Sequence, residues 1–309
     1  MTRISDRGLR IGTRASPLAL WQANHVADRL RPRVAPRPVE IVHVQTEGDR
    51  DQFGSLAHIG GRGVFTKEIE RALLDGRVDV AVHSLKDLPT LPVDGLTLAA
   101  IPPRGPSGDV LVAADVARFD SLPAGARVAT GSLRRRSQLL HRRPDLLLAD
   151  IRGNVETRLR KLRDEGYDAL VLAEAGLERL GLLAVVTEVL DPTWMLPAVG
   201  QGALGLECRT DDAETRSLLA GLDHPTTRQA VEAERALLCH LGGGCQVPLG
   251  AIGRDDGKRL LLRAAVLSSD GSRRVAGEES GPATDAAMIG ERLAAKLRTL
   301  GAAELIATG

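Results

Sequence analysis

The sequence predicts an α/β protein with two doubly wound lobes, followed by a smaller C-terminal α+β domain. Short strand patterns alternate with helical patterns over residues 9–83, and the same alternation returns over residues 110–173. Such alternation is typical of a mostly parallel sheet that carries helices on both faces. From about residue 211, two helical patterns precede a hairpin and a closing helix. That succession is typical of an α+β domain.

Two segments rich in glycine and proline mark the crossings between the lobes. They are residues 102–108 (PPRGPSG) and 196–202 (LPAVGQG), and such clusters interrupt regular structure. Two lobes joined by such crossings leave a cleft at the carboxyl ends of their strands, where α/β sheets bind ligands. The predicted domains are residues 1–102 with 203–220, residues 103–202, and residues 221–309.

The first lobe is predicted as β-α-β-α-β. Residues 9–14 alternate as a strand, and Ser16 and Pro17 then supply an N-cap and a first-turn proline for a helix. Residues 47–63 form a long, glycine-bearing loop, and loops of that length are often lids or binding loops. The remaining elements are strands at 39–45 and 78–83 and a helix at 65–74.

The second lobe and the C-terminal domain follow the same hydrophobic periodicities. Strands are expected at 110–113, 127–130, 146–150 and 169–173, with helices at 132–142, 154–165 and 174–180. One more buried strand is expected at 203–208, after the second crossing. Helices at 212–222 and 226–241 then precede strands at 259–267 and 273–278, which flank a Ser269-Asp270-Gly271 turn. A helix at 287–300 closes the chain.

Composition excludes several classes of protein. The 309 residues include 41 basic and 40 acidic side chains, so no global field attracts nucleic acid or a membrane. Only 2% of residues are aromatic, which argues against base-stacking surfaces. The three cysteines form no C-x-x-C pair, so neither a disulfide framework nor a metal site is expected. Without a signal peptide or a long apolar run, a cytoplasmic location is expected.

One of these cysteines, Cys245, lies in a loop of unusual backbone freedom. Three glycines, residues 242–244, end the helical pattern before it, and Pro248 prevents a new helix from starting. A free cysteine is most often a small buried hydrophobe. The alternative interpretation is that the loop presents Cys245 as an attachment point or nucleophile.

Arginines concentrate between residues 127 and 163, where ten arginines and one lysine face three acids. Arg160, Lys161 and Arg163 are also explained by an ordinary solvated helix face. Arg134 and Arg135, by contrast, lie in the first turn of a helix, where positive charge is unfavourable unless an anion binds there. Because the guanidinium fork binds carboxylates or phosphates bidentately, the stretch predicts a ligand with several anionic groups.

A hydroxyl, a cation and a carboxylate lie within four residues after the buried strand at 78–83. They belong to Ser84, Lys86 and Asp87. One interpretation is a simple turn before Pro89. The other is a catalytic turn in which the Lys–Asp pair tunes the pKa of the carboxylate and holds it beside a developing positive charge.

Taken together, these segments resemble the hydroxymethylbilane synthase family, also called porphobilinogen deaminases. Six motifs in matching order carry the resemblance: residues 10–23 (RIGTRASPLALWQA), 82–89 (VHSLKDLP), 131–139 (GSLRRRSQL), 152–159 (RGNVETRL), 196–209 (LPAVGQGALGLECR) and 242–251 (GGGCQVPLGA). The resemblance implies two lobes like type II periplasmic binding proteins and a third domain with the cysteine loop. It also implies a transferase that condenses four porphobilinogen molecules into hydroxymethylbilane for tetrapyrrole synthesis.

The resemblance further implies a role for each matching residue. Cys245 carries a covalent dipyrromethane cofactor, and Asp87 stabilises cationic pyrrole intermediates and assists proton transfer. The acetate and propionate groups of cofactor and substrate are bound by Arg14, Arg134, Arg135, Arg152 and Arg158, with further contacts from Ser16, Ser84, Lys86, Ser132 and Gln201. No metal, nucleic acid or membrane is involved, and the family favours a monomer.

The chain departs from the family pattern at two places. His58 and Arg62 occupy loop positions where lysine is frequent in the family. The family also has a pair of serines at positions 131 and 132, and because the first is Gly131 here, only Ser132 can supply a hydroxyl. Two rival functions remain at this point: a binding protein of periplasmic type without a modified cysteine, and a phosphate or nucleic-acid binder that uses the arginine stretch. Neither rival explains the glycine–cysteine loop.

Overall fold

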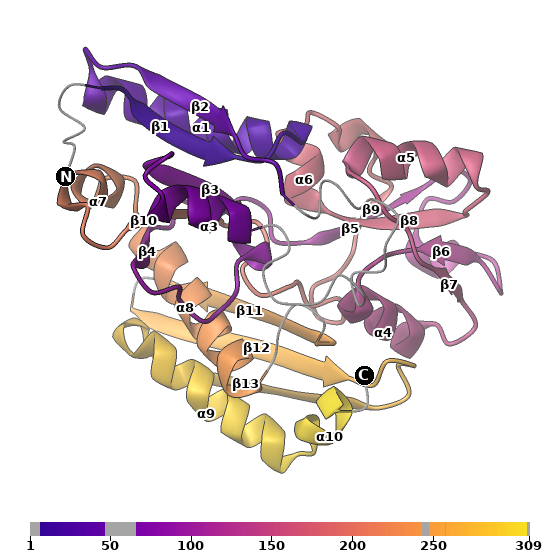
Figure 1. Ribbon diagram of the computed structural model, residues 1–309. Coiled ribbons are helices and arrows are strands. Elements are labelled where there is room, and N and C mark those ends of the chain that lie inside the picture. Colours follow the sequence, from indigo (N-terminus) through magenta and orange to yellow (C-terminus); the bar gives the residue numbers. More distant parts are fainter. Residues whose placement is uncertain (1–6, 47–65, 243–246, 257, 308–309) are drawn as a thin grey trace. The chain divides into compact units, whose positions relative to one another are not determined.

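The computed structural model describes residues 7–46, 66–242, 247–256 and 258–307 (Figure 1). It divides into two compact units, Met1–Arg104 with Ala203–Arg228 and Gly105–Gly202 with Gln229–Gly309. Two of the three crossings between the units fall inside or beside the predicted breaker-rich segments, and the third falls between Arg228 and Gln229. The three-domain boundaries stay a prediction. Within the described ranges, no helix has the length and apolar character needed to cross a bilayer.

The first unit is a five-stranded sheet with helices on both faces. Its strands lie in the order β2-β1-β3-β10-β4, and β10 is antiparallel to its two neighbours. Apolar side chains of α1 and α7 pack on one face, and those of α3 pack on the other. The elements are β1 (Leu9–Thr13), α1 (Pro17–Val34), β2 (Val39–His43), α3 (Lys67–Leu74), β3 (Val80–Ser84), the short 3-10 helix η2 (Leu85–Asp87), β4 (Leu96–Ala100), β10 (Leu204–Arg209) and α7 (Ala213–Ala220).

The second unit contains another five-stranded sheet, with its strands in the order β7-β6-β8-β5-β9. As in the first unit, the fourth strand is antiparallel to both neighbours, here β5 against β8 and β9. Helix α4 covers one face and α5 with α6 the other. The elements are β5 (Asp109–Ala113), η3 (Phe119–Ser121), β6 (Arg127–Ala129), α4 (Leu133–Arg142), β7 (Leu147–Ala149), α5 (Val155–Asp164), β8 (Ala169–Ala173), α6 (Glu174–Arg179), η4 (Leu183–Val185) and β9 (Glu188–Val189).

The same unit also holds a three-stranded antiparallel sheet, β11-β12-β13, with helices on one face. Leucines, alanines and isoleucine from α8, α9 and α10 form the core against it. The elements are α8 (Pro225–His240), β11 (Leu249–Asp255), β12 (Arg259–Leu267), β13 (Arg274–Pro282), η5 (Ala283–Asp285), α9 (Ala286–Thr299) and α10 (Ala302–Ala307). The predicted fold class, two doubly wound lobes with a smaller α+β domain, is confirmed.

Strands β4, β9 and β11 were absent from the sequence-based prediction. No strand was expected directly after Pro248, yet β11 begins at Leu249. A Cβ at Gly250 would lie 2.6 Å from Leu196 Cβ, so this glycine permits a close pass of another segment over the strand. In this sheet glycine marks packing rather than a turn.

Candidate functional site

The carboxyl edge of the second unit's β6-β7-β8 sheet gathers most of the predicted anion-binding side chains. Strands β7 and β8 both run parallel to β6, so all three end at the same edge. Helix α4 starts just after β6, with Ser132 as its N-cap: the Ser132 hydroxyl accepts from Arg135 N at 3.4 Å. Because β5 is antiparallel, its first residue, Asp109, lies at this edge too, opposite Ala173.

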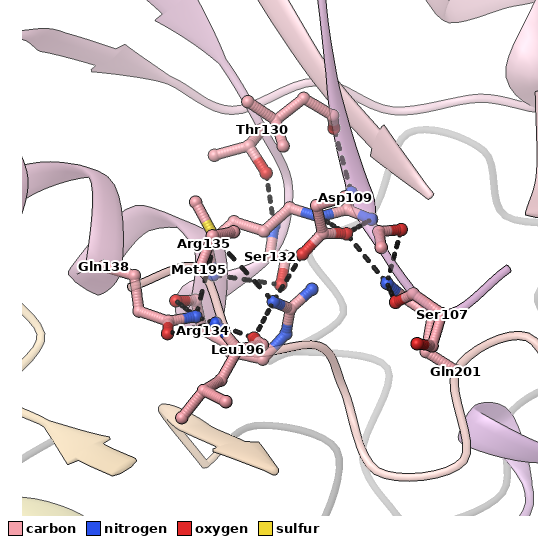
Figure 2. Close-up of polar contacts among 12 residues, drawn as sticks. Ser107, Asp109, Thr130, Ser132, Arg134, Arg135, Gln138, Met195, Leu196 and Gln201 are labelled. Atoms are coloured by element: carbon pink, nitrogen blue, oxygen red, sulfur yellow. Dashed lines mark hydrogen bonds and ion pairs between the residues drawn. The ribbon is translucent and has the colours of Figure 1, made fainter. Parts of the chain in front are cut away.

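Asp109 is the centre of a buried ion network there (Figure 2). Its side chain is fully buried, and its Oδ2 accepts from Arg134 Nη1 at 2.6 Å. Its Oδ1 accepts from Arg135 Nε at 3.0 Å and Nη2 at 2.8 Å, and from Gln201 Nε2 at 2.9 Å. Gln201 also donates to the carbonyls of Ser107 and Gly108. One carboxylate therefore holds two arginines and the crossing segment around Gln201.

The charges in this network are strongly coupled. Burial by itself would raise the pKa of Asp109, but attraction by Arg134 and Arg135 outweighs burial and holds that pKa well below its usual range. Burial lowers the pKa of Arg134, and the carboxylate opposes that change. Because guanidinium groups remain protonated in proteins, one carboxylate faces two positive charges here, and the cluster carries a net positive charge.

The arginine-rich sequence predicts that Arg134 and Arg135 present open forks to a ligand, whereas the structure pairs both with an internal carboxylate. Each residue is only 5% exposed. Arg135 donates from its third nitrogen, Nη1, to Val171 O at 2.9 Å. Arg134 Nη1 also donates to Leu196 O at 2.6 Å, while Arg134 Nε is buried without a hydrogen-bond acceptor among the described residues. An unsatisfied buried guanidinium N–H is a donor for an arriving anion.

Arg152 and Arg158 lie at the same edge, after β7, and are less buried than the Asp109 network. Arg152 Nε is 3.4 Å from Asp150 Oδ2, and its side chain is 28% exposed. Arg158 Nε donates to Gly153 O at 2.8 Å. Gly131 adjoins them, and a Cβ there would lie 2.8 Å from Ile151 O. In this chain a serine at position 131 would therefore crowd the turn that carries Arg152.

The carboxyl edge of the first unit's sheet carries the other predicted residues. Arg14 follows β1, and Ser16 caps α1 by accepting from Ala19 N at 3.4 Å. The Ser84 hydroxyl at the end of β3 is held by buried Gln22, whose Nε2 lies 2.9 Å away. Lys86 and Asp87 follow in η2, where Lys86 is half-buried and Asp87 is exposed. Gln22 was missed from sequence because it reads as an ordinary helix residue.

A buried acid–histidine pair, also missed, lies directly behind this turn. His83 Nε2 on β3 is 3.1 Å from Glu207 Oε2 on β10, and both side chains are under 10% exposed. Glu70 of α3 is buried nearby. Burial raises the pKa of Glu70, and the charge of Glu207 raises it further, whereas His83 lowers it. The pair ties β10 to β3 one residue before Ser84.

Three predicted positions lie outside the described residues: Cys245, His58 and Arg62. The other two cysteines are described. Cys208 is buried in β10, where burial raises the pKa of its thiol to about 12, so it is a core residue and no nucleophile. Cys239 is half-buried near the end of α8. Among the described residues, no cluster of histidine, cysteine and acidic side chains could hold a metal ion.

Comparison with known proteins decides the family. Residues 9–217 match the family described as "Porphobilinogen deaminase, dipyromethane cofactor binding domain", and residues 228–299 match "Porphobilinogen deaminase, C-terminal domain". The chain belongs to the porphobilinogen deaminase family. A porphobilinogen deaminase of Geobacter metallireducens is 50% identical over 304 residues, which cover 98% of this chain and 95% of that protein. A Geobacter sulfurreducens porphobilinogen deaminase is 50% identical over 299 residues, covering 97% and 94%.

Solved structures give a weaker likeness. The crystal structure of the methionine-binding protein MetQ has a TM-score of 0.45 and 16% identity, covering 74% of this chain and 93% of that one. A putative methionine-binding lipoprotein of Bacillus subtilis has a TM-score of 0.44 and 11% identity, covering 71% and 90%. Scores of this size carry no argument about ligand. The confirmed fold class rests on the sheets and helices described above.

The porphobilinogen deaminase family's dipyrromethane cofactor agrees with the chemistry of the described side chains. The predicted donors around it are arginines, serines and an amide, all of which bind carboxylates. The net positive charge of the Asp109 network and the buried Arg134 Nε also favour an anionic group at this edge. The residues present therefore fit a polycarboxylate cofactor.

Proposed function

We propose that this protein is a hydroxymethylbilane synthase, which condenses four porphobilinogen molecules stepwise, with loss of ammonia, and releases linear hydroxymethylbilane for tetrapyrrole synthesis. The observation that carries the proposal is the match of almost the whole chain to porphobilinogen deaminases. The two sheet edges supply the chemistry this reaction needs. One carries a cluster of arginines and the other an exposed carboxylate beside a lysine.

The arginines are proposed to bind the carboxylates of cofactor and substrate. Each pyrrole unit brings an acetate and a propionate, so a growing chain is a polyanion. Arg152 and Arg158, which are only partly buried, can receive carboxylates directly, as can Arg14 in the other unit. Arg134 and Arg135 supply the positive field from a fixed position, since Asp109 and backbone carbonyls lock both guanidinium groups. Ser16, Ser84, Ser132 and Gln201 position these groups or add contacts.

Asp87 is the proposed catalytic residue. Loss of ammonia from porphobilinogen leaves a cationic pyrrole. This cation couples to the terminal ring of the growing chain, and that ring then releases a proton from the carbon at which the new bond has formed. An exposed carboxylate can stabilise that cation and accept the proton. Lys86, the preceding residue, can bind a substrate carboxylate. The Gln22–Ser84 pair fixes the start of the turn that holds both groups.

Cys245 is the proposed attachment point of the dipyrromethane cofactor. When bound, that cofactor supplies the pyrrole to which the first substrate is joined, and it remains on the enzyme when the product leaves. His58 and Arg62 are proposed as loop contacts, Arg62 with a permanent charge and His58 with one that depends on pH. The proposed enzyme is a cytoplasmic monomer that binds neither nucleic acid nor membrane, as supported by its balanced charge and cysteine pattern.

A direct assay tests this function. Purified protein incubated with porphobilinogen should consume it and release four molecules of ammonia for each linear tetrapyrrole formed. Substrate consumption without ammonia, or binding of porphobilinogen without turnover, would instead support the binding-protein alternative.

Replacing Arg152 and Arg134 with leucine in separate variants should separate ligand binding from folding. Arg152→Leu is expected to lower kcat/KM by roughly 10- to 150-fold, the cost of one charge-assisted hydrogen bond of about 1.5–3 kcal/mol. Its melting temperature should stay close to that of the wild type, because its pair with Asp150 is long, at 3.4 Å, and is only partly shielded from solvent. Arg134→Leu should lose both activity and stability. Both variants are compared with the wild type by steady-state kinetics and thermal unfolding. If the kinetics of Arg152→Leu were unchanged, Arg152 would be an ordinary surface residue with no role in ligand binding.

A further inference from the structure

The three-stranded sheet of the second unit has one face that α8, α9 and α10 leave open. Its helix side is filled by the core against α8, α9 and α10. On the opposite face, Ile252, Ala265 and Ala276 pack with Leu196, a residue of the crossing segment. Beyond that contact the face borders a cavity of about 420 Å³. The cavity is therefore walled by the sheet on one side and by the crossing segment on another.

Positive charge dominates this cavity. Three arginines line it, Arg254 of β11, Arg263 of β12 and Arg274 of β13, against a single acid, Glu278. Arg263 Nε donates to Glu278 Oε2 at 2.8 Å, so that pair is neutral. Arg254 and Arg274 are exposed and have no ion-pair partner within the part of the chain that the structure describes. Two guanidinium groups are thus available to an anion.

The two available arginines lie far apart along the sheet. Arg254 is opposite Leu261 of β12, whereas Arg274 is opposite Leu267, six residues further along the same strand. At roughly 3.3 Å per residue, the two positions are about 20 Å apart. A ligand that uses both must carry anionic groups at separated points of an extended body. A single pyrrole with two neighbouring carboxylates is too small to do so.

Apolar side chains and one neutral ion pair form the surface between the arginines. Leu261, Ile252 and Leu196 line the cavity. The Arg263–Glu278 pair lies beside Ile252, because Arg263 is opposite both Ile252 and Glu278. An apolar floor with guanidinium groups at its rim favours a ligand with a flat hydrophobic body and carboxylates at its edge. Because guanidinium forks bind carboxylates bidentately, arginine is better suited than lysine to such a ligand.

We propose that this cavity is a second binding site, separate from the Asp109 edge, for a tetrapyrrole that carries several carboxylates. The proposal rests on the proposed function, since the chain's own product belongs to that chemical class. A ligand here would also touch Leu196, whose carbonyl accepts hydrogen bonds from Arg134 Nη1 at 2.6 Å and Gln138 Nε2 at 3.0 Å. The site is therefore in direct contact with the segment that holds Arg134 in place.

The test uses uroporphyrin, a stable fluorescent tetrapyrrole with eight carboxylates, as the probe. Binding is titrated to cofactor-loaded protein in an Asp87→Asn background, so that added porphobilinogen occupies the catalytic site without forming product. The variants are the double substitution Arg254→Ala/Arg274→Ala and the control Arg292→Ala, on the exposed surface of α9. Turnover of each substitution is measured with Asp87 restored.

We expect the probe to bind and to stay bound in saturating porphobilinogen. The double substitution should weaken binding by at least about tenfold, as expected for the loss of two charge-assisted contacts, whereas Arg292→Ala should not change it. Turnover should be unaffected by either, which shows that both proteins are folded. Displacement by porphobilinogen, equal binding by the double variant, or no binding at all would overturn the proposal. Failure of the synthase assay would contradict the proposed function but leave this binding result standing.

Discussion

Asp87→Asn should leave the protein folded and reduce the rate of elongation by about 10²- to 10⁴-fold, the range for loss of a positioned proton-transfer group. Asparagine preserves the size of the side chain but can neither neutralise a cationic pyrrole nor accept its proton. Stability should be unaffected because Asp87 is exposed and its carboxylate has no hydrogen-bond or ion-pair partner among the described residues. Single-turnover release of ammonia from porphobilinogen measures the effect directly.

Asp94→Asn is the matched control, because Asp94 is an exposed acid in the same unit and has no proposed role. It should behave as the wild type, and Asp87→Glu should recover part of the lost rate. If Asp87→Asn released ammonia at nearly the wild-type rate, Asp87 would not be the catalytic carboxylate, and the turn would return to a structural interpretation.

Asp109→Asn should produce the largest loss of stability. Removing one partner of a buried ion pair typically costs about 3–5 kcal/mol, because the remaining charge stays buried without compensation. Here two arginines, each 5% exposed, would be left in that condition. Denaturant unfolding should show the loss, and any folded variant should bind porphobilinogen more weakly because Arg134 and Arg135 are no longer fixed.

The stability effect of Asp109 should also depend on pH. Since the pKa of Asp109 is depressed in the folded state, its contribution is fully present above the unfolded-state pKa of about 3.9 and is lost as pH falls below it. The difference between wild type and Asp109→Asn should therefore shrink in acid. Asp120→Asn, which breaks an exposed pair with Arg142, should cost less than about 1 kcal/mol. Equal costs for the two variants would contradict the role of Asp109.

The sequence predicted the sheet edges well and the interior of the site poorly. Ser84, Asp87 and Arg152 could be placed because parallel strands end at one edge, and that rule requires only the strand order. Asp109 was missed because it begins a strand, and strand beginnings lie at the far edge of a parallel sheet. Asp109 lies at the site because β5 runs antiparallel to β8. The sequence signal that could have indicated it was an acid directly before the apolar run VLVA at residues 110–113.

Pairing partners were also beyond sequence reasoning. The arginines were recognised as anion-binding groups, yet whether their anion is a ligand or an internal carboxylate depends on contacts between residues 25 or more positions apart. Gln22 and Ser84 are likewise separated by 62 positions. Strand β11 was also missed, and its Gly250 makes room for Leu196, a contact between residues 54 positions apart.

Intact-mass analysis of the purified protein tests the central claim, that Cys245 carries a covalent dipyrromethane. Protein made in cells that supply porphobilinogen should be heavier than its sequence by two porphobilinogen units less two molecules of ammonia. Cys245→Ser should have the mass of its sequence alone and should be inactive, while Cys239→Ser should keep the added mass. A wild-type protein with the unmodified mass of its sequence would contradict the account.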